Sequence, residues 1–76
     1  MPRLPLISGR ECVKALEKIG FEVDRQRGSH IVLRRDEPEP ARTVVVANHK
    51  EIDRGTLKGI IEQAGLTTDE FLELLD

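Results

Sequence analysis

Residues 21–35 read FEVDRQRGSHIVLRR, and their pattern decides the fold. Apolar and polar residues alternate on both sides of Gly28, which is typical of two half-buried β-strands. A glycine between such runs supplies the positive φ of a tight turn, so the two strands are predicted to pair antiparallel. A third strand is predicted at residues 42–48, which are rich in β-branched side chains and follow a proline-containing loop at residues 36–40. The sequence therefore predicts a three-stranded antiparallel meander.

A helix is predicted before this sheet, over residues 9–19. Ser8 and Glu11 have the spacing of a capping box, in which each side chain accepts a hydrogen bond from the backbone N–H of the other residue. Gly20 stands where a helix commonly ends in a left-handed residue. The residues that form an apolar stripe at helical spacing are Val13, Leu16 and Ile19.

Two more helices are predicted after the sheet. The first follows residues 52–56 and ends at Gly65, and Thr67 with Glu70 forms a second capping box for a short last helix. We therefore expect an α+β fold of order α-β-β-β-α with a short C-terminal helix. The helices should cover one face of the antiparallel sheet and leave the other face to solvent or a partner. The apolar face of the first of these two helices comprises Leu57, Ile60, Ile61 and Ala64.

Length and composition favour a small protein without a cofactor. At 76 residues, the chain 1–76 is expected to form one domain. Cys12 is the single cysteine, and with His30 and His49 it makes no cluster with zinc-ligand spacing, so we expect no metal site. No apolar stretch is long enough for a signal-peptide core or a membrane span. These features predict a cytoplasmic protein without a membrane partner.

Charge is distributed unevenly along the chain. Residues 1–35 hold eight Lys and Arg against four Asp and Glu, whereas residues 36–76 hold four against ten. The net charge of -2 therefore conceals a basic first half that can attract a polyanion. The alternative is that the uneven charge is ordinary solvated surface.

His30 is the strongest candidate for a catalytic side chain. Because side chains alternate across a strand, the face that carries Ile31 and Leu33 should meet the helices, and His30 should stand on the open face. Histidine exchanges a proton near neutral pH, and guanidinium groups hold phosphate oxygens. The combination indicates cleavage of RNA by attack of a 2′-hydroxyl on the adjacent phosphorus, with His30 as general base or acid. DNA lacks that hydroxyl, so we expect no cleavage of DNA. We also expect no binding of DNA by this chain alone. The arginines proposed to bind RNA around His30 are Arg25, Arg27 and Arg34.

The residues beside His30 have alternative interpretations. Ser29 suggests a serine nucleophile, but consecutive strand residues point to opposite faces, which places Ser29 and His30 poorly for that chemistry. Ser29 is better interpreted as a residue that caps the turn or donates to a phosphate, and Gly28 as the turn residue. For His30 itself, the alternative is a turn histidine held by a hydrogen bond.

Arg34 and three more polar residues near the strand ends have alternative interpretations. Arg34 and Arg35 should point to opposite faces, so only one of them is expected to reach a substrate, and adjacent arginines at a strand end can also serve to deter aggregation. His49 and Lys50 follow the third strand and are interpreted as phosphate contacts, with a solvated loop as the alternative.

Several segments carry a family resemblance that covers nearly the whole chain. They are residues 16–21 (LEKIGF), 25–30 (RQRGSH), 44–46 (VVV) with His49, and 55–66 (GTLKGIIEQAGL). In these segments the chain resembles the HicA family of mRNA interferase toxins. The resemblance implies a fold like the double-stranded-RNA-binding domain, mRNA cleavage by the histidine that matches His30, and membership of a type II toxin–antitoxin pair. It also implies a HicB-type antitoxin that covers the active face. One departure is that the family often has a proline before the third-strand histidine, where this chain has Ala47-Asn48.

Two other functions compete with the nuclease. A non-catalytic RNA-binding module of the same fold would bind RNA in a salt-sensitive manner without cutting it, and a pure interaction domain would dock through its acidic second half. Base stacking is not expected, because the chain has no Trp or Tyr and because Phe21 and Phe71 occupy core-facing positions. Recognition of RNA should then rest on backbone and shape, with weak sequence specificity.

Overall fold

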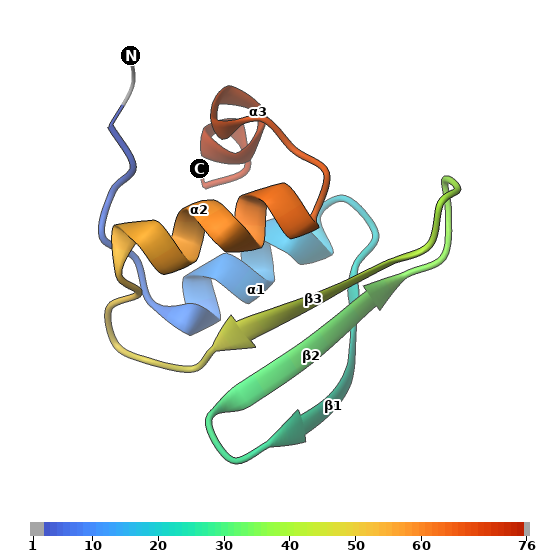
Figure 1. Ribbon diagram of the computed structural model, residues 1–76, viewed down its shortest axis with the longest axis horizontal. Coiled ribbons are helices and arrows are strands. Elements are labelled where there is room, and N and C mark those ends of the chain that lie inside the picture. Colours follow the sequence, from blue (N-terminus) through green and yellow to red (C-terminus); the bar gives the residue numbers. More distant parts are fainter. Residues whose placement is uncertain (1–2, 76) are drawn as a thin grey trace.

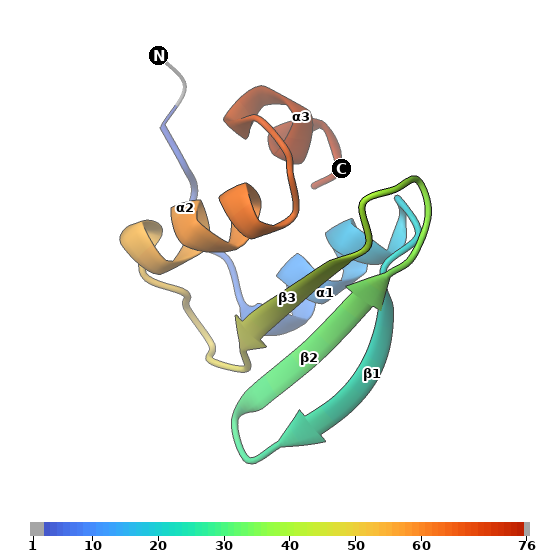
Figure 2. The same cartoon turned by 45° about the vertical axis from the view of Figure 1, so that its right-hand side comes forward.

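The computed structural model describes residues 3–75 and has the predicted order of elements. Figures 1 and 2 show α1 and α2 over one face of the sheet and α3 beyond α2, farther from the strands. The α+β class predicted from the sequence is therefore confirmed. The elements are α1 (Gly9–Glu17), β1 (Glu22–Arg27), β2 (His30–Arg35), β3 (Arg42–Ala47), α2 (Arg54–Gln63) and α3 (Thr68–Glu73).

The helix caps form as the sequence predicts. The Glu11 N–H donates to Ser8 Oγ over 3.1 Å, and the Ser8 N–H donates to Glu11 Oε1 over 2.9 Å, which stabilises the carboxylate and lowers the pKa of Glu11. Thr67 and Glu70 form the same arrangement at α3. Helix α1 ends at Glu17, two residues before the predicted end, because the chain then turns toward Gly20, whose φ is +98°.

The sheet has the strand order β1-β2-β3, and both pairs are antiparallel. The hairpin turn lies at Gly28, with φ +58°, as predicted. Strand β3 ends at Ala47, one residue before the predicted end. All six residues of the outer strand β1 are exposed, and Val23 is 48% exposed although it was expected to alternate into the core. The buried side chains between the sheet and the helices include Leu16, Phe21, Leu33, Val44, Val46, Ile52, Leu57, Ile61 and Phe71.

A β-bulge in β1 corrects the simple alternation predicted for that strand. Val23 pairs with Leu33, but the next pair along is Arg25 with Val32, so Asp24 is the extra residue. Without this bulge Arg25 would share a face with Val23. The bulge instead brings Arg25 to the open face, opposite Val32.

Gly9 is the point at which α1 contacts the end of the sheet. A Cβ at Gly9 would overlap the carbonyl oxygen of Ala47 and would lie 2.8 Å from the Cα of Asn48. The Gly9 N–H donates to the His49 carbonyl over 2.8 Å. The first turn of α1 is therefore fixed against the segment that follows β3.

We expect Gly9→Ala to lower the free energy of unfolding by about 1–3 kcal/mol, because the new methyl group must displace backbone. Gly59, inside α2, is the matched control, because a Cβ there meets nothing within 4 Å. Gly59→Ala should raise the free energy of unfolding by about 0.5–1 kcal/mol through helix propensity. Urea unfolding of the two variants measures both effects. Equal stability of Gly9→Ala and the wild type would contradict the close contact between Gly9 and the backbone of Ala47 and Asn48.

Candidate active site

His30 begins β2 and lies on the open face of the sheet. Its neighbours across the two strand pairs are Arg27 on β1 and Ala47 on β3. The residue is exposed, and within residues 3–75 its imidazole has no hydrogen-bond or ion-pair partner. A turn histidine held by a hydrogen bond is therefore not what the structure contains. The ring is accessible to a ligand that approaches the open face.

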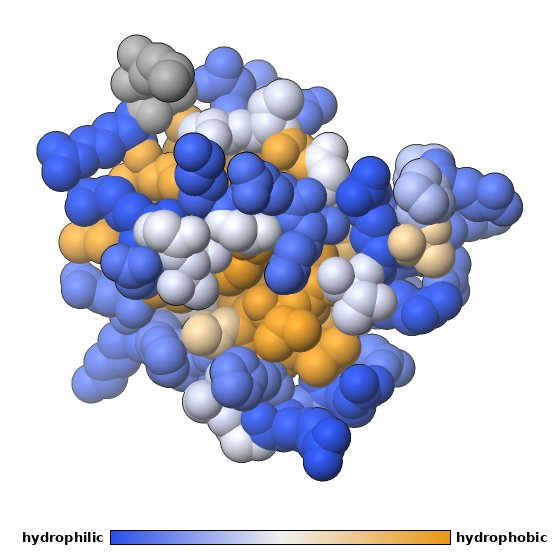
Figure 3. Space-filling view, viewed as in Figure 1, coloured by the Kyte–Doolittle hydropathy of each residue, from blue (hydrophilic) through white to orange (hydrophobic). Residues whose placement is uncertain are grey.

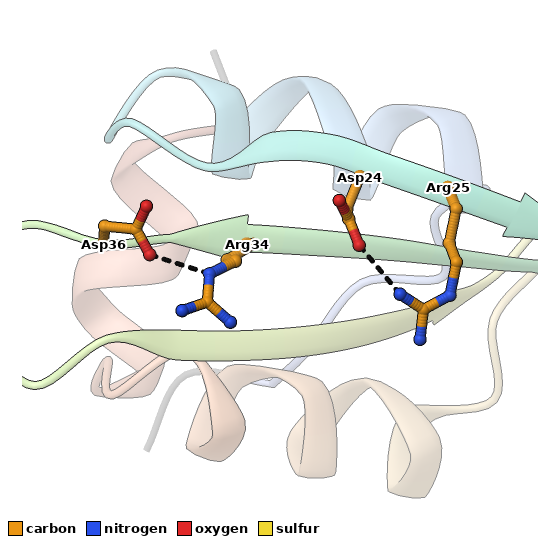
Figure 4. Close-up of polar contacts among 4 residues, drawn as sticks. All are labelled: Asp24, Arg25, Arg34 and Asp36. Atoms are coloured by element: carbon orange, nitrogen blue, oxygen red, sulfur yellow. Dashed lines mark hydrogen bonds and ion pairs between the residues drawn. The ribbon is translucent and has the colours of Figure 1, made fainter.

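Arg27 is the guanidinium paired directly with His30. Residues opposite one another in an antiparallel pair project to the same face, so both side chains face the same ligand. Arg25 lies on the same face but donates to Asp24 over 2.8 Å (Figure 4). In the part of the chain that the structure describes, Arg27 has no such acidic partner. Its charge is therefore available to an anion beside the imidazole.

Arg34 and Arg35 are separated as the sequence predicts. Arg35 lies on the helix side, with its guanidinium carbon 4.7 Å from the centre of the Phe21 ring. Arg34 lies on the open face and donates to Asp36 over 2.7 Å (Figure 4). It is four residues along β2 from His30, which corresponds to roughly 13 Å. The structure therefore does not bring Arg34 together with His30.

The turn before His30 is tied to the end of β3. The Asn48 N–H donates to the Ser29 carbonyl over 2.7 Å. His49 and Lys50 follow at once and are exposed, so both lie at the same end of the sheet as His30. The structure therefore brings Gly28, Ser29, His49 and Lys50 to the same end of the sheet as His30 and Arg27.

Hydrophobic side chains occupy the middle of the open face. Val32 is only 8% exposed, because Arg25 and Val45 flank it in the strand register, whereas Val45 is 41% exposed. Figure 3 shows a hydrophobic area over β2 and β3 that is bordered by hydrophilic side chains. We call Val32, Val45 and Ala47 the open-face patch.

Three polar residues near His30 were not singled out from the sequence. Arg10, Gln26 and Asn48 line one groove, although they come from α1, β1 and the segment after β3. The sequence offers one signal for Arg10, which lies in the first turn of α1. A cation there interacts unfavourably with the helix dipole, which favours a role other than stabilising the helix. No local pattern pointed to Gln26 or Asn48.

Cys12 lies in the hydrophobic core and not on the open face with His30. Cys12 is fully buried, and burial raises the pKa of its thiol to about 12. The thiol is therefore protonated at neutral pH and is a poor nucleophile.

Within the described residues, no group of three or more His, Cys, Asp or Glu side chains could hold a metal ion.

Comparison with protein families gives a match over residues 9–66. The matching family is described as HicA toxin of bacterial toxin-antitoxin. The matched segment includes α1, the whole sheet and α2. No curated protein matches the sequence.

The arrangement predicts unequal effects for two arginines of the same charge. If the site binds RNA, as the sequence predicts, Arg27→Ala should weaken binding of a short RNA by about tenfold. The slope of log affinity against log salt concentration should fall by the amount expected for one lost phosphate contact. Arg34→Ala is the control and should change the affinity by less than about threefold, because Arg34 is held by Asp36 away from His30. Fluorescence anisotropy over a range of salt concentrations measures both. Equal losses of RNA affinity in the two variants would show that binding depends on net charge alone and not on the position of Arg27.

Proposed function

Because this chain belongs to the HicA family of toxins of bacterial toxin–antitoxin systems, we propose that it is an endoribonuclease that cleaves mRNA in the cytoplasm. The observation that carries the proposal is the pair of Arg27 and His30 on an open face. A proton-transfer group and a phosphate-binding group are the two functions that cleavage of a phosphodiester requires.

The proposed reaction uses the RNA itself as the nucleophile. The 2′-oxygen forms a bond to the adjacent phosphorus while the bond from phosphorus to the 5′-oxygen breaks. His30, as base, takes the 2′-hydroxyl proton, or, as acid, protonates the 5′-oxygen, and water exchanges the other proton. The products are a 2′,3′-cyclic phosphate and a 5′-hydroxyl. Arg27 stabilises the negative charge that develops on the phosphate oxygens.

We expect His30→Ala to abolish cleavage while the protein stays folded, because His30 is exposed and its side chain holds no other residue. The expected loss is about 100-fold to 10,000-fold. The assay is incubation of RNA with purified protein in chelator, with mapping of product ends. Lys58→Ala is the control, because Lys58 is an exposed residue of α2, and this variant should cleave RNA at the same rate as the wild type.

The outcomes separate the competing functions. A 5′-phosphate product, a requirement for metal, or an active His30→Ala variant would each overturn the mechanism. Binding of RNA by the wild type without any cleavage would identify a non-catalytic RNA-binding module. No affinity for RNA at low salt would favour an interaction domain.

The family membership also gives this toxin an antitoxin partner. In our proposal a HicB-type antitoxin covers the open face and so excludes mRNA from His30. The open-face patch supports this, because Val45 is 41% exposed there, and an exposed hydrophobic residue rimmed by charges is typical of protein interfaces.

Val45→Asp should weaken antitoxin binding by roughly 30-fold or more, because a charge would be buried in the hydrophobic centre of the interface. Thr43→Asp is the matched control, since it adds the same charge on β3 two residues away, outside the patch. Isothermal calorimetry with the antitoxin measures both. Similar affinities for the two variants would show that the antitoxin binds outside the open-face patch.

No helix within residues 3–75 is both long enough and apolar enough to span a membrane.

A further inference from the structure

A groove lies between α1 and the β1–β2 hairpin, on the helix side of the sheet. Its volume is about 190 Å³. One part of its lining is apolar, and the other part is polar and includes the positively charged side chain of Arg10. The apolar residues are Val13, Val23 and Ile31, and the polar residues are Arg10, Gln26 and Asn48.

The fold builds this groove from two close contacts. The missing side chain of Gly9 allows the first turn of α1 to reach the backbone of Asn48, which brings Arg10 beside the hairpin. The side-chain amide of Gln26 donates to the Gly28 carbonyl over 3.1 Å, so Gln26 is held at the tip of the hairpin. The side-chain amide of Asn48 makes no hydrogen bond within residues 3–75 and remains available to a ligand.

We propose that this groove binds one base of single-stranded RNA, next to the phosphate that His30 contacts, and that Asn48 and Gln26 recognise the edge of that base. The inference rests on the proposed nuclease function and adds a source of sequence preference to it. Side-chain amides recognise base edges because they offer a donor and an acceptor in one plane. The aliphatic walls of Val13, Val23 and Ile31 can contact the flat faces of the base, and Arg10 can neutralise a phosphate.

The groove and His30 lie back to back at the hairpin. Gln26 pairs with Ile31, and the next pair is Arg27 with His30. Since neighbouring residues of a strand project to opposite faces, the groove and the open-face site lie on opposite faces of the hairpin, at adjacent residue pairs. A Cβ built at Gly28 meets nothing within 4 Å, so an RNA backbone can pass over the turn from one face to the other.

An extended peptide added to the free edge of β1 is the competing occupant. The bulge at Val23–Arg25 and the charged residues of this strand disfavour such strand addition. Arg10, the cation that lines the groove, favours a phosphate-bearing ligand, and Arg27 lies at the same end of the hairpin on the open face. RNA is therefore the occupant that the charges and the strand geometry support.

The test is titration of the wild-type protein with four 2′-O-methyl tetranucleotides that differ in one base, followed by NMR. These oligonucleotides lack the free 2′-hydroxyl, so binding is read without cleavage. We expect the side-chain NH₂ signals of Gln26 and Asn48 to shift, and one base to bind roughly tenfold more tightly than the others. Asn48→Asp keeps the shape but replaces the donor by an acceptor, so it should change which base is preferred. Lys58→Ala should leave the preference unchanged.

Each outcome decides between the proposals. Shifts confined to the open face, or an unchanged base preference in Asn48→Asp, would overturn the groove inference. Cleavage by the wild type without base preference would do so too, and would leave the nuclease intact. Shifts at Gln26 and Asn48 in a protein that cuts no RNA would leave the groove inference standing and overturn the nuclease.

Discussion

Two backbone hydrogen bonds at the end of β3 join the parts of the molecule that surround His30. The Asn48 N–H donates to the Ser29 carbonyl over 2.7 Å, and the Gly9 N–H donates to the His49 carbonyl over 2.8 Å. They connect the hairpin turn, the end of the sheet and the start of α1. The lack of a side chain at Gly9 is what permits the second of these contacts. The position of Arg10 in the groove depends on this junction, which also ties the hairpin turn before His30 to the segment after β3.

The β1 bulge decides which charges meet the histidine. Strand β1 begins with Glu22 and Val23 in register with β2, and the extra residue Asp24 then reverses the alternation. As a result Arg27 faces the same side as His30. Asp24, the extra residue of the bulge, forms an ion pair of 2.8 Å with Arg25, which reduces the charge that Arg25 presents. Of the arginines proposed from the sequence, Arg27 is thus the one best placed to hold a phosphate beside the imidazole.

The two faces of the sheet serve different roles. The helix face carries the core, which holds Leu33 and Phe21 and against which Arg35 packs through the ring of Phe21. The open face combines an exposed histidine, a guanidinium and an apolar centre at Val45. A nucleic acid can use the charges and a protein can use the apolar centre, so one face can bind either partner and not both at once. Under the proposed function, this competition is how an antitoxin on the open face would inhibit the toxin.

The sequence by itself determined the elements and their order, because the caps at Ser8 and Thr67, the turn at Gly28 and the apolar periodicities are local properties. It also determined that His30 faces away from Leu33, since alternation within β2 is regular. Only the tertiary structure decided which arginine meets His30, because a bulge adds one residue to a strand without a clear local signal. Likewise, only folding brought Arg10, Gln26 and Asn48 into one groove, because their contact depends on distant segments that pack at Gly9.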